Sequence, residues 1–150
     1  DYHRSAKLAG LEIISPPLSN ELDFRVDFSE LENLLREGDI LFLGRPNNPT
    51  GVSFDQDDFL AVVSRFPDVF FAVDESFYSF IDSASGLISS GMPSNLIVFR
   101  SLTKFYGIPG LRLGFAAASP TLASPPGSAW GRCCTIWPRA KGGITASRGR

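Results

Sequence analysis

A chain of 150 residues is long enough to bury a core and to form one domain. Its composition, 43% hydrophobic and 20% charged, is ordinary for a globular protein, and a net charge of −2 gives no basic surface for nucleic acid. No apolar run approaches the ~18–20 residues of a membrane span, and residue 1 is Asp, with no secretory signal after it. We therefore expect a cytoplasmic chain that binds neither nucleic acid nor membrane, and the missing initiator Met indicates a fragment.

Short apolar runs along the chain have the composition of buried strands. They are rich in Ile, Val, Leu and Phe and end at glycine or at polar residues. The segment RPNNPTG, at residues 45–51, is a turn by composition. The predicted strands are 11–15, 39–44, 69–74, 95–101 and 112–118.

Two segments between the predicted strands have helical periodicity. Residues 28–38 carry Ser29 and Glu32 at the spacing of a capping box, and they place leucines on one face. Residues 54–67 begin with acidic residues and also have one apolar face. Phenylalanines at strand or helix spacing are predicted to lie in the core, namely Phe59, Phe66, Phe70, Phe71 and Phe80.

Strands that are apolar on both faces and alternate with helices are typical of a covered parallel sheet. We therefore predict an α/β protein with a partial, mostly parallel sheet and helices on both faces. Ligands of such sheets bind at the carboxyl ends of the strands. The polar residues at three successive strand exits are Asn47 and Asn48, then Asp74 and Glu75, then Ser101, Thr103 and Lys104.

Other charged residues near these exits are predicted to have supporting or ordinary roles. Glu75 is predicted to be structural or to support Asp74. Arg45 and Arg100 flank strands at the end where an anion could bind, but both are predicted to be surface residues.

Residues 119–150 differ from the rest of the chain. They hold both tryptophans and both cysteines, carry basic charges without any acid, and show no helical or strand period. We predict a partial domain over 1–118 and an atypical basic tail over 119–150, which is disordered or is not the natural continuation, as after a shifted reading frame. Cys133 and Cys134 are adjacent and have no second pair, so neither a disulfide nor a metal site is expected.

Lys104 is the strongest chemical candidate among the strand exits. An amine at a buried strand exit, partly desolvated and close to cations, is held in the neutral form that attacks a carbonyl. A cofactor that needs such an amine, an acid for a ring nitrogen and a phosphate site is pyridoxal phosphate. Any single one of these polar residues could also be an ordinary loop residue. The candidate contacts are Asp74 for the ring nitrogen, Asn48 for the phenolic oxygen, and Ser101, Thr103 and Arg112 for the phosphate.

Three motifs occur in a fixed order, PNNPTG at 46–51, VDESF at 73–77 and SLTKFYGIPGLRLGF at 101–115. Together they resemble the core of the fold type I, class I/II aminotransferase-like enzymes, which use pyridoxal phosphate. The resemblance implies that Lys104 is the catalytic lysine, which binds the cofactor and moves protons on the substrate. It also implies that Asn48, Asp74, Ser101 and Arg112 contact the cofactor.

Within that family, residues 100–115 are most similar to threonine-phosphate decarboxylases of cobalamin biosynthesis, with histidinol-phosphate aminotransferases as the alternative. Three residues after the Asp, the aminotransferases usually carry Tyr, whose hydroxyl bonds the phenolic oxygen. Here that position is Phe77, which favours the decarboxylase and a small amino acid phosphate as substrate. A neutral change to Phe, or an offset that lets Tyr78 serve, stays open.

The resemblance also implies parts that this chain does not contain. Enzymes of the family are longer, are homodimers, and grip the substrate with an arginine of a C-terminal small domain. This chain would be a central portion, in which Tyr2 and His3 are helix residues and not catalytic ones. Two hypotheses follow: the chain keeps the enzyme's lysine and its function, or it is a non-catalytic remnant that binds the cofactor weakly and turns nothing over.

Overall fold

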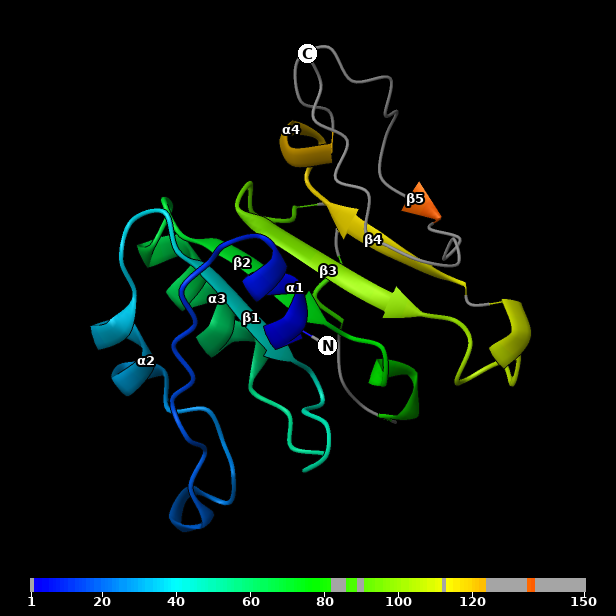
Figure 1. Ribbon diagram of the computed structural model, residues 1–150, viewed down its shortest axis with the longest axis horizontal. Coiled ribbons are helices and arrows are strands. Elements are labelled where there is room, and N and C mark those ends of the chain that lie inside the picture. Colours follow the sequence, from blue (N-terminus) through cyan, green and yellow to red (C-terminus); the bar gives the residue numbers. More distant parts are fainter. Residues whose placement is uncertain (1, 82–85, 89–90, 112, 124–134, 137–150) are drawn as a thin grey trace.

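The computed structural model describes residues 2–81, 86–88, 91–111, 113–123 and 135–136. Its centre is one sheet with the strand order β1-β2-β3-β4-β5 (Figure 1). The first three strands are parallel, and β4 and β5 continue the sheet in antiparallel pairs. This mixed α/β sheet confirms the predicted fold class. The strands are β1 (Ile40–Gly44), β2 (Phe70–Asp74), β3 (Leu96–Ser101), β4 (Gly114–Ala118) and β5 (Thr135–Ile136).

The direction of β4 follows from the short connection before it. Among the described residues between Ser101 and Gly114 no helix is long enough for a crossover, and a parallel neighbour needs such a crossover. The chain instead turns back, so that Ser101 pairs with Gly114 and Val98 with Ala117. The strand predicted over 112–118 therefore begins at Gly114 in the structure and runs against its neighbour.

The strand predicted over residues 11–15 is wrong. These residues form no regular element, and Ile14 remains 67% exposed. Pro16 and Pro17 follow directly and have no N–H to donate to a neighbouring strand. Apolar composition alone is therefore not enough to make these residues a strand.

The helices are α1 (Tyr2–Leu8), α2 (Phe28–Leu34), α3 (Gln56–Arg65) and α4 (Pro120–Ala123), with short 3-10 turns at Asn20–Leu22, Tyr78–Phe80 and Pro109–Leu111. The capping box predicted at Ser29 and Glu32 is not the one used. Asp27 caps α2, and its Oδ1 accepts the backbone N–H groups of Ser29 and Glu30 at 2.9 and 3.1 Å. The Ser29 hydroxyl, which donates to the same oxygen, is the main cause that holds the pKa of Asp27 below its usual range.

The two faces of the sheet are covered by different helices (Figure 1). On one face α3 packs its fully buried Phe59 against Phe71 of β2, with ring centroids 5.8 Å apart. On the other face Tyr2 of α1 stacks on Phe42 of β1 at 3.9 Å. The prediction of helices on both faces is thus confirmed, whereas Phe80, predicted to be in the core, is 58% exposed because it lies in a turn beyond β2.

The strand register brings the three predicted exits to one edge. Gly44 pairs with Asp74, and Asp74 pairs with Phe99, so β1, β2 and β3 end side by side. The polar residues that follow these strands therefore share one end of the sheet, as parallel pairing requires. Within the described segments, no helix has the length and apolarity to cross a membrane.

Most of the predicted tail lies outside the described residues. Of residues 119–150, the structure describes Ser119, α4 and β5. The division of the chain at residue 118 stays a prediction.

Candidate functional site

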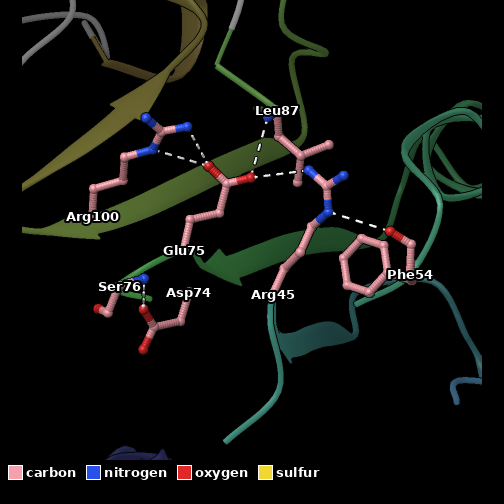
Figure 2. Close-up of polar contacts among 7 residues, drawn as sticks. All are labelled: Arg45, Phe54, Asp74, Glu75, Ser76, Leu87 and Arg100. Carbon is pink, nitrogen blue, oxygen red and sulfur yellow. Dashed lines mark hydrogen bonds and ion pairs between the residues drawn. The ribbon is translucent and has the colours of Figure 1, made fainter. Parts of the chain in front are cut away.

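Asp74 ends β2 and presents a half-buried carboxylate at the edge of the sheet. Its Oδ1 accepts the backbone N–H of Ser76 at 2.7 Å, which fixes the side chain over the turn that follows (Figure 2). Its Oδ2 accepts the hydroxyl of Tyr2. Two donors from separate parts of the chain therefore orient this carboxylate.

Tyr2 was predicted only to be a helix residue, but it contacts the candidate site through Asp74. Its ring stacks on Phe42, and its hydroxyl reaches a carboxylate 72 residues further along the chain. Burial, and then the hydrogen bond to Asp74, raise the pKa of Tyr2 well above its usual range. No local pattern could reveal a contact over this separation.

Replacing Tyr2 by Phe should change how stability depends on pH. A tyrosine whose pKa is raised by folding contributes its stability below the unfolded pKa of about 10 and loses it at higher pH. The free energy of unfolding of the wild type should therefore fall more steeply between neutral pH and about pH 11 than that of the Tyr2→Phe variant, as measured by urea titration. Equal slopes for wild type and Tyr2→Phe would contradict the contact.

The exit of β3 gathers two hydroxyls and an amine. The Ser101 and Thr103 hydroxyls lie 2.8 Å apart, and Thr103 is buried. The following turn is closed by the Ile108 N–H, which donates to the Thr103 carbonyl at 3.0 Å, and by Gly107, whose φ of +62° favours glycine. This turn makes the chain swing back after Lys104. An open pocket of about 310 Å³ is lined by Ser76, Phe99, Arg100, Ser101, Thr103, Lys104 and residues 113–116.

Lys104 lies differently from what its sequence position indicated. We predicted a partly desolvated amine at a buried strand exit, but the residue is exposed, because the turn carries it beyond the end of β3 to the rim of the pocket. Its Nζ lies 4.4 Å from the centre of the Phe77 ring. The amine is therefore open to a ligand and has an aromatic face beside it.

The structure does not bring Asn48, another predicted cofactor contact, into the pocket. Asn48 is exposed in the turn after β1, where the neighbouring Asn47 makes the hydrogen bonds that close the turn, to Thr50, Gly51 and Val52. The register places this turn at the same edge as Asp74, but Asn48 does not line the pocket. Arg112 lies outside the described residues.

Gly114 lets β3 and β4 approach closely beside the pocket. A Cβ at this position would lie 2.8 Å from the carbonyl oxygen of Arg100, which is backbone and cannot move aside alone. The residue also pairs with Ser101. Glycine here therefore sets where the Ser101 hydroxyl sits.

We expect Gly114→Ala to lower the free energy of unfolding by about 1–3 kcal/mol, the usual effect of overpacking. The clash should shift β4 and with it the pocket wall. Gly110→Ala is the matched control, because a Cβ there meets nothing within 4 Å. Urea unfolding of both variants checks the difference, and equal stabilities would contradict the close approach.

Arg45 is buried and Arg100 is partly buried, with 23% of its side chain exposed, which corrects the prediction that both are surface residues. Arg45 is only 4% exposed, and both arginines bind the fully buried carboxylate of Glu75 (Figure 2). The prediction failed because it treated each charge singly, whereas an arginine can be buried when a carboxylate is buried with it. We call Arg45, Glu75 and Arg100 the buried triad.

Comparison with known proteins places this geometry in a family. The family model for aminotransferase class I and II matches residues 1–130 of the chain. The chain belongs to this aminotransferase family.

The proteins of this family that are similar to the chain are named for different activities. The chain is 36% identical over 82% of its length to the adenosylcobalamin biosynthesis bifunctional protein CobDQ of Leptospira interrogans, of which it covers 15%. It is 38% identical over 81% of its length to a histidinol-phosphate aminotransferase of Chlorobium limicola, of which it covers 34%. The solved L-threonine-O-3-phosphate decarboxylase of Porphyromonas gingivalis matches 81% of the chain with a TM-score of 0.63 and 27% identity. The chain covers 35% of that structure, so it spans about a third of such relatives or less.

The residues present fit pyridoxal phosphate, the cofactor of the aminotransferase family. An accessible amine and a pair of hydroxyls line one pocket, and a half-buried carboxylate stands at the neighbouring strand end. Each oxygen of Asp74 accepts one hydrogen bond, Oδ2 from the Tyr2 hydroxyl and Oδ1 from the Ser76 N–H. A carboxylate has about four acceptor positions, so a ring N–H can still bind there.

Proposed function

We propose that this chain carries the lysine-bearing part of a pyridoxal-phosphate enzyme that acts on a small amino acid phosphate, most specifically a threonine-phosphate decarboxylase. The family and the fit of the strand-exit residues support the cofactor. The side chain that faces Lys104 supports the decarboxylase. We propose a homodimer for an enzyme of this kind.

The positions of Phe77 and Tyr78 favour a decarboxylase over an aminotransferase. The ring beside the amine of Lys104 is Phe77, which has no hydroxyl to donate. Tyr78 packs on the guanidinium of Arg100 at 4.3 Å, on the side of the buried triad. Tyr78 therefore does not replace the hydroxyl that aminotransferases usually place near the cofactor.

Each residue of the site would have a separate task. The bound cofactor supplies an aldehyde and a ring that withdraws electrons from the substrate. Lys104 would hold the aldehyde end of the cofactor through its amine and would take and return protons at the substrate carbon. Asp74 would hold the ring nitrogen. Ser101 and Thr103 would donate to the phosphate, and Asn48 and Arg112 are proposed as further contacts.

A histidinol-phosphate aminotransferase remains the second candidate, because a relative with that name is as similar to this chain as the cobalamin protein is. The two reactions use the same lysine and differ in the bond that is broken. Decarboxylation releases carbon dioxide from threonine phosphate, whereas transamination moves the amino group of histidinol phosphate to an acceptor.

Borohydride trapping tests the cofactor assignment directly. The chain is incubated with pyridoxal phosphate, reduced and digested, and the modified lysine is located by mass spectrometry. We expect the label on Lys104 at cofactor concentrations that leave the exposed Lys7 unlabelled. Equal labelling of both lysines would show a non-specific amine reaction and would contradict the proposal.

The reaction is tested on the same preparation. Carbon dioxide released from threonine phosphate supports the decarboxylase, and amine transfer from histidinol phosphate supports the aminotransferase. Selective labelling of Lys104 without either product would support a cofactor-binding remnant, because the substrate grip of the family lies outside this chain.

A further inference from the structure

We propose that Glu75 is a positioning residue: held between Arg45 and Arg100, it fixes the ends of β1, β2 and β3 and thereby the places of Asp74 and Ser101. The effect of Glu75 on cofactor binding rests on the proposed function. Its effect on the strand ends does not depend on the cofactor.

The buried triad joins three separate strands at the edge where the site lies. Arg45 directly follows β1, Glu75 directly follows β2, and Arg100 is the last residue but one of β3. Figure 2 shows the carboxylate of Glu75 between the two guanidinium groups, while that of Asp74 points away from them. One side chain thus connects all three parallel strands.

The contacts of Glu75 satisfy both carboxylate oxygens. Oε1 accepts from Arg45 Nη1 at 3.2 Å and from the Leu87 N–H at 3.2 Å. Oε2 accepts from Arg100 Nε at 3.0 Å and Nη2 at 2.8 Å. Each arginine binds a separate oxygen, so displacing either guanidinium breaks a charge-assisted bond to a carboxylate that is itself fully buried.

Backbone hydrogen bonds connect the residues of the buried triad to the neighbouring strand ends at the site. The N–H of Arg45 donates to the Asp74 carbonyl at 2.9 Å, and the N–H of Glu75 donates to the Phe99 carbonyl at 2.8 Å. Successive side chains of a strand point to opposite faces. Glu75 therefore lies on the face opposite its neighbour Asp74, and Arg100 lies opposite its neighbour Ser101.

The surroundings are shaped to hold the triad. The ring of Tyr78 lies 4.3 Å from the Arg100 guanidinium, and a Cβ at Gly86 would come within 2.2 Å of Arg100 Nη2. Burying three charges is costly, and apolar residues of similar volume would often give equal stability. Unlike apolar packing, ion pairs require a fixed orientation of the groups that form them. They therefore hold the strand ends in one relative orientation, as a site at these ends requires.

Hydrogen exchange tests this role without cofactor. In Glu75→Gln we expect the amides of residues 45 and 75 to exchange at least tenfold faster relative to the amide of Phe71, which donates to the Asn95 carbonyl. A purely stabilising role would speed exchange at all three amides alike, and that result would overturn the proposal. Glu32→Gln is the control, because it removes an ion pair with Arg65 on the surface side of the helices.

Arg100→Lys covers the case in which Glu75→Gln does not fold. It keeps the charge beside Glu75 but loses the two-pronged contact, so it should speed exchange of the residue 75 amide several-fold relative to Phe71. Unchanged relative exchange in this variant would overturn the proposal.

Cofactor binding gives the second readout. If the wild type binds pyridoxal phosphate through Lys104, both triad variants should bind at least tenfold more weakly, and Glu32→Gln should bind as the wild type does. Wild-type affinity in a folded triad variant would overturn the positioning role. Local exchange changes in a chain that never binds pyridoxal phosphate would leave the strand-end role standing and would contradict the proposed function instead.

Discussion

Lys104→Ala is expected to abolish the specific attachment of pyridoxal phosphate to this chain. Lys104 is the lysine whose amine lies at the rim of the strand-end pocket, beside the ring of Phe77. Without this amine the aldehyde has no nucleophile there. The visible absorbance of the bound cofactor, and the reduced adduct in the mass spectrum, should both be lost.

Lys7→Ala is the matched control, since it removes an exposed lysine of α1. It should titrate as the wild type does. If the absorbance change were kept in Lys104→Ala and lost in Lys7→Ala, the cofactor would be attached to α1. That result would contradict the assignment of Lys104. Because Lys104 is exposed, its loss should leave the thermal melting of the chain nearly unchanged.

Phe59→Ala is expected to have the largest effect on stability. The side chain is fully buried, and its ring centroid lies 4.9 Å from that of Phe54 and 5.8 Å from that of Phe71. Truncation of a buried Phe costs about 3–5 kcal/mol, through lost transfer free energy and the cavity that remains. The total stability of a small domain is about 5–15 kcal/mol, so much of it should disappear.

Urea unfolding followed by circular dichroism measures this loss. Phe105→Ala is the control, because Phe105 is 50% exposed and its ring makes edge contacts with Phe80 and Tyr106. It should cost about 1 kcal/mol or less. Equal losses in the two variants would mean that α3 is not packed on β2 as described.

The three parallel strands could be predicted because their signal is local. Runs that are buried on both faces are apolar throughout, so 39–44, 69–74 and 95–101 stood out and match the observed β1, β2 and β3 closely. The rule that ligands bind at carboxyl ends then selected Asp74, Ser101 and Lys104. Local composition and one topological rule were sufficient to place these residues at one end of the sheet.

The contacts that hold the site could not be predicted in this way. Tyr2 and Asp74 are separated by 72 residues, and Arg45 and Glu75 by 30. Local periodicity holds no information about pairs over such distances. A charge that flanks a strand looks the same in sequence whether it is solvated or buried with a partner, and for that reason both arginines of the triad were misassigned.

The adjacent carboxylates of Asp74 and Glu75 make β2 sensitive to a slip of its register by one residue. Such a slip would turn every side chain of β2 to the opposite face, and it would put either Val73 in the place of Asp74 or Ser76 in the place of Glu75. Neither of these residues carries a charge, so the slipped strand would leave either Tyr2 or the two arginines without a carboxylate. The partners on the two faces of β2 thus fix its register together, and they decide which of the two neighbouring acids stays inside the protein.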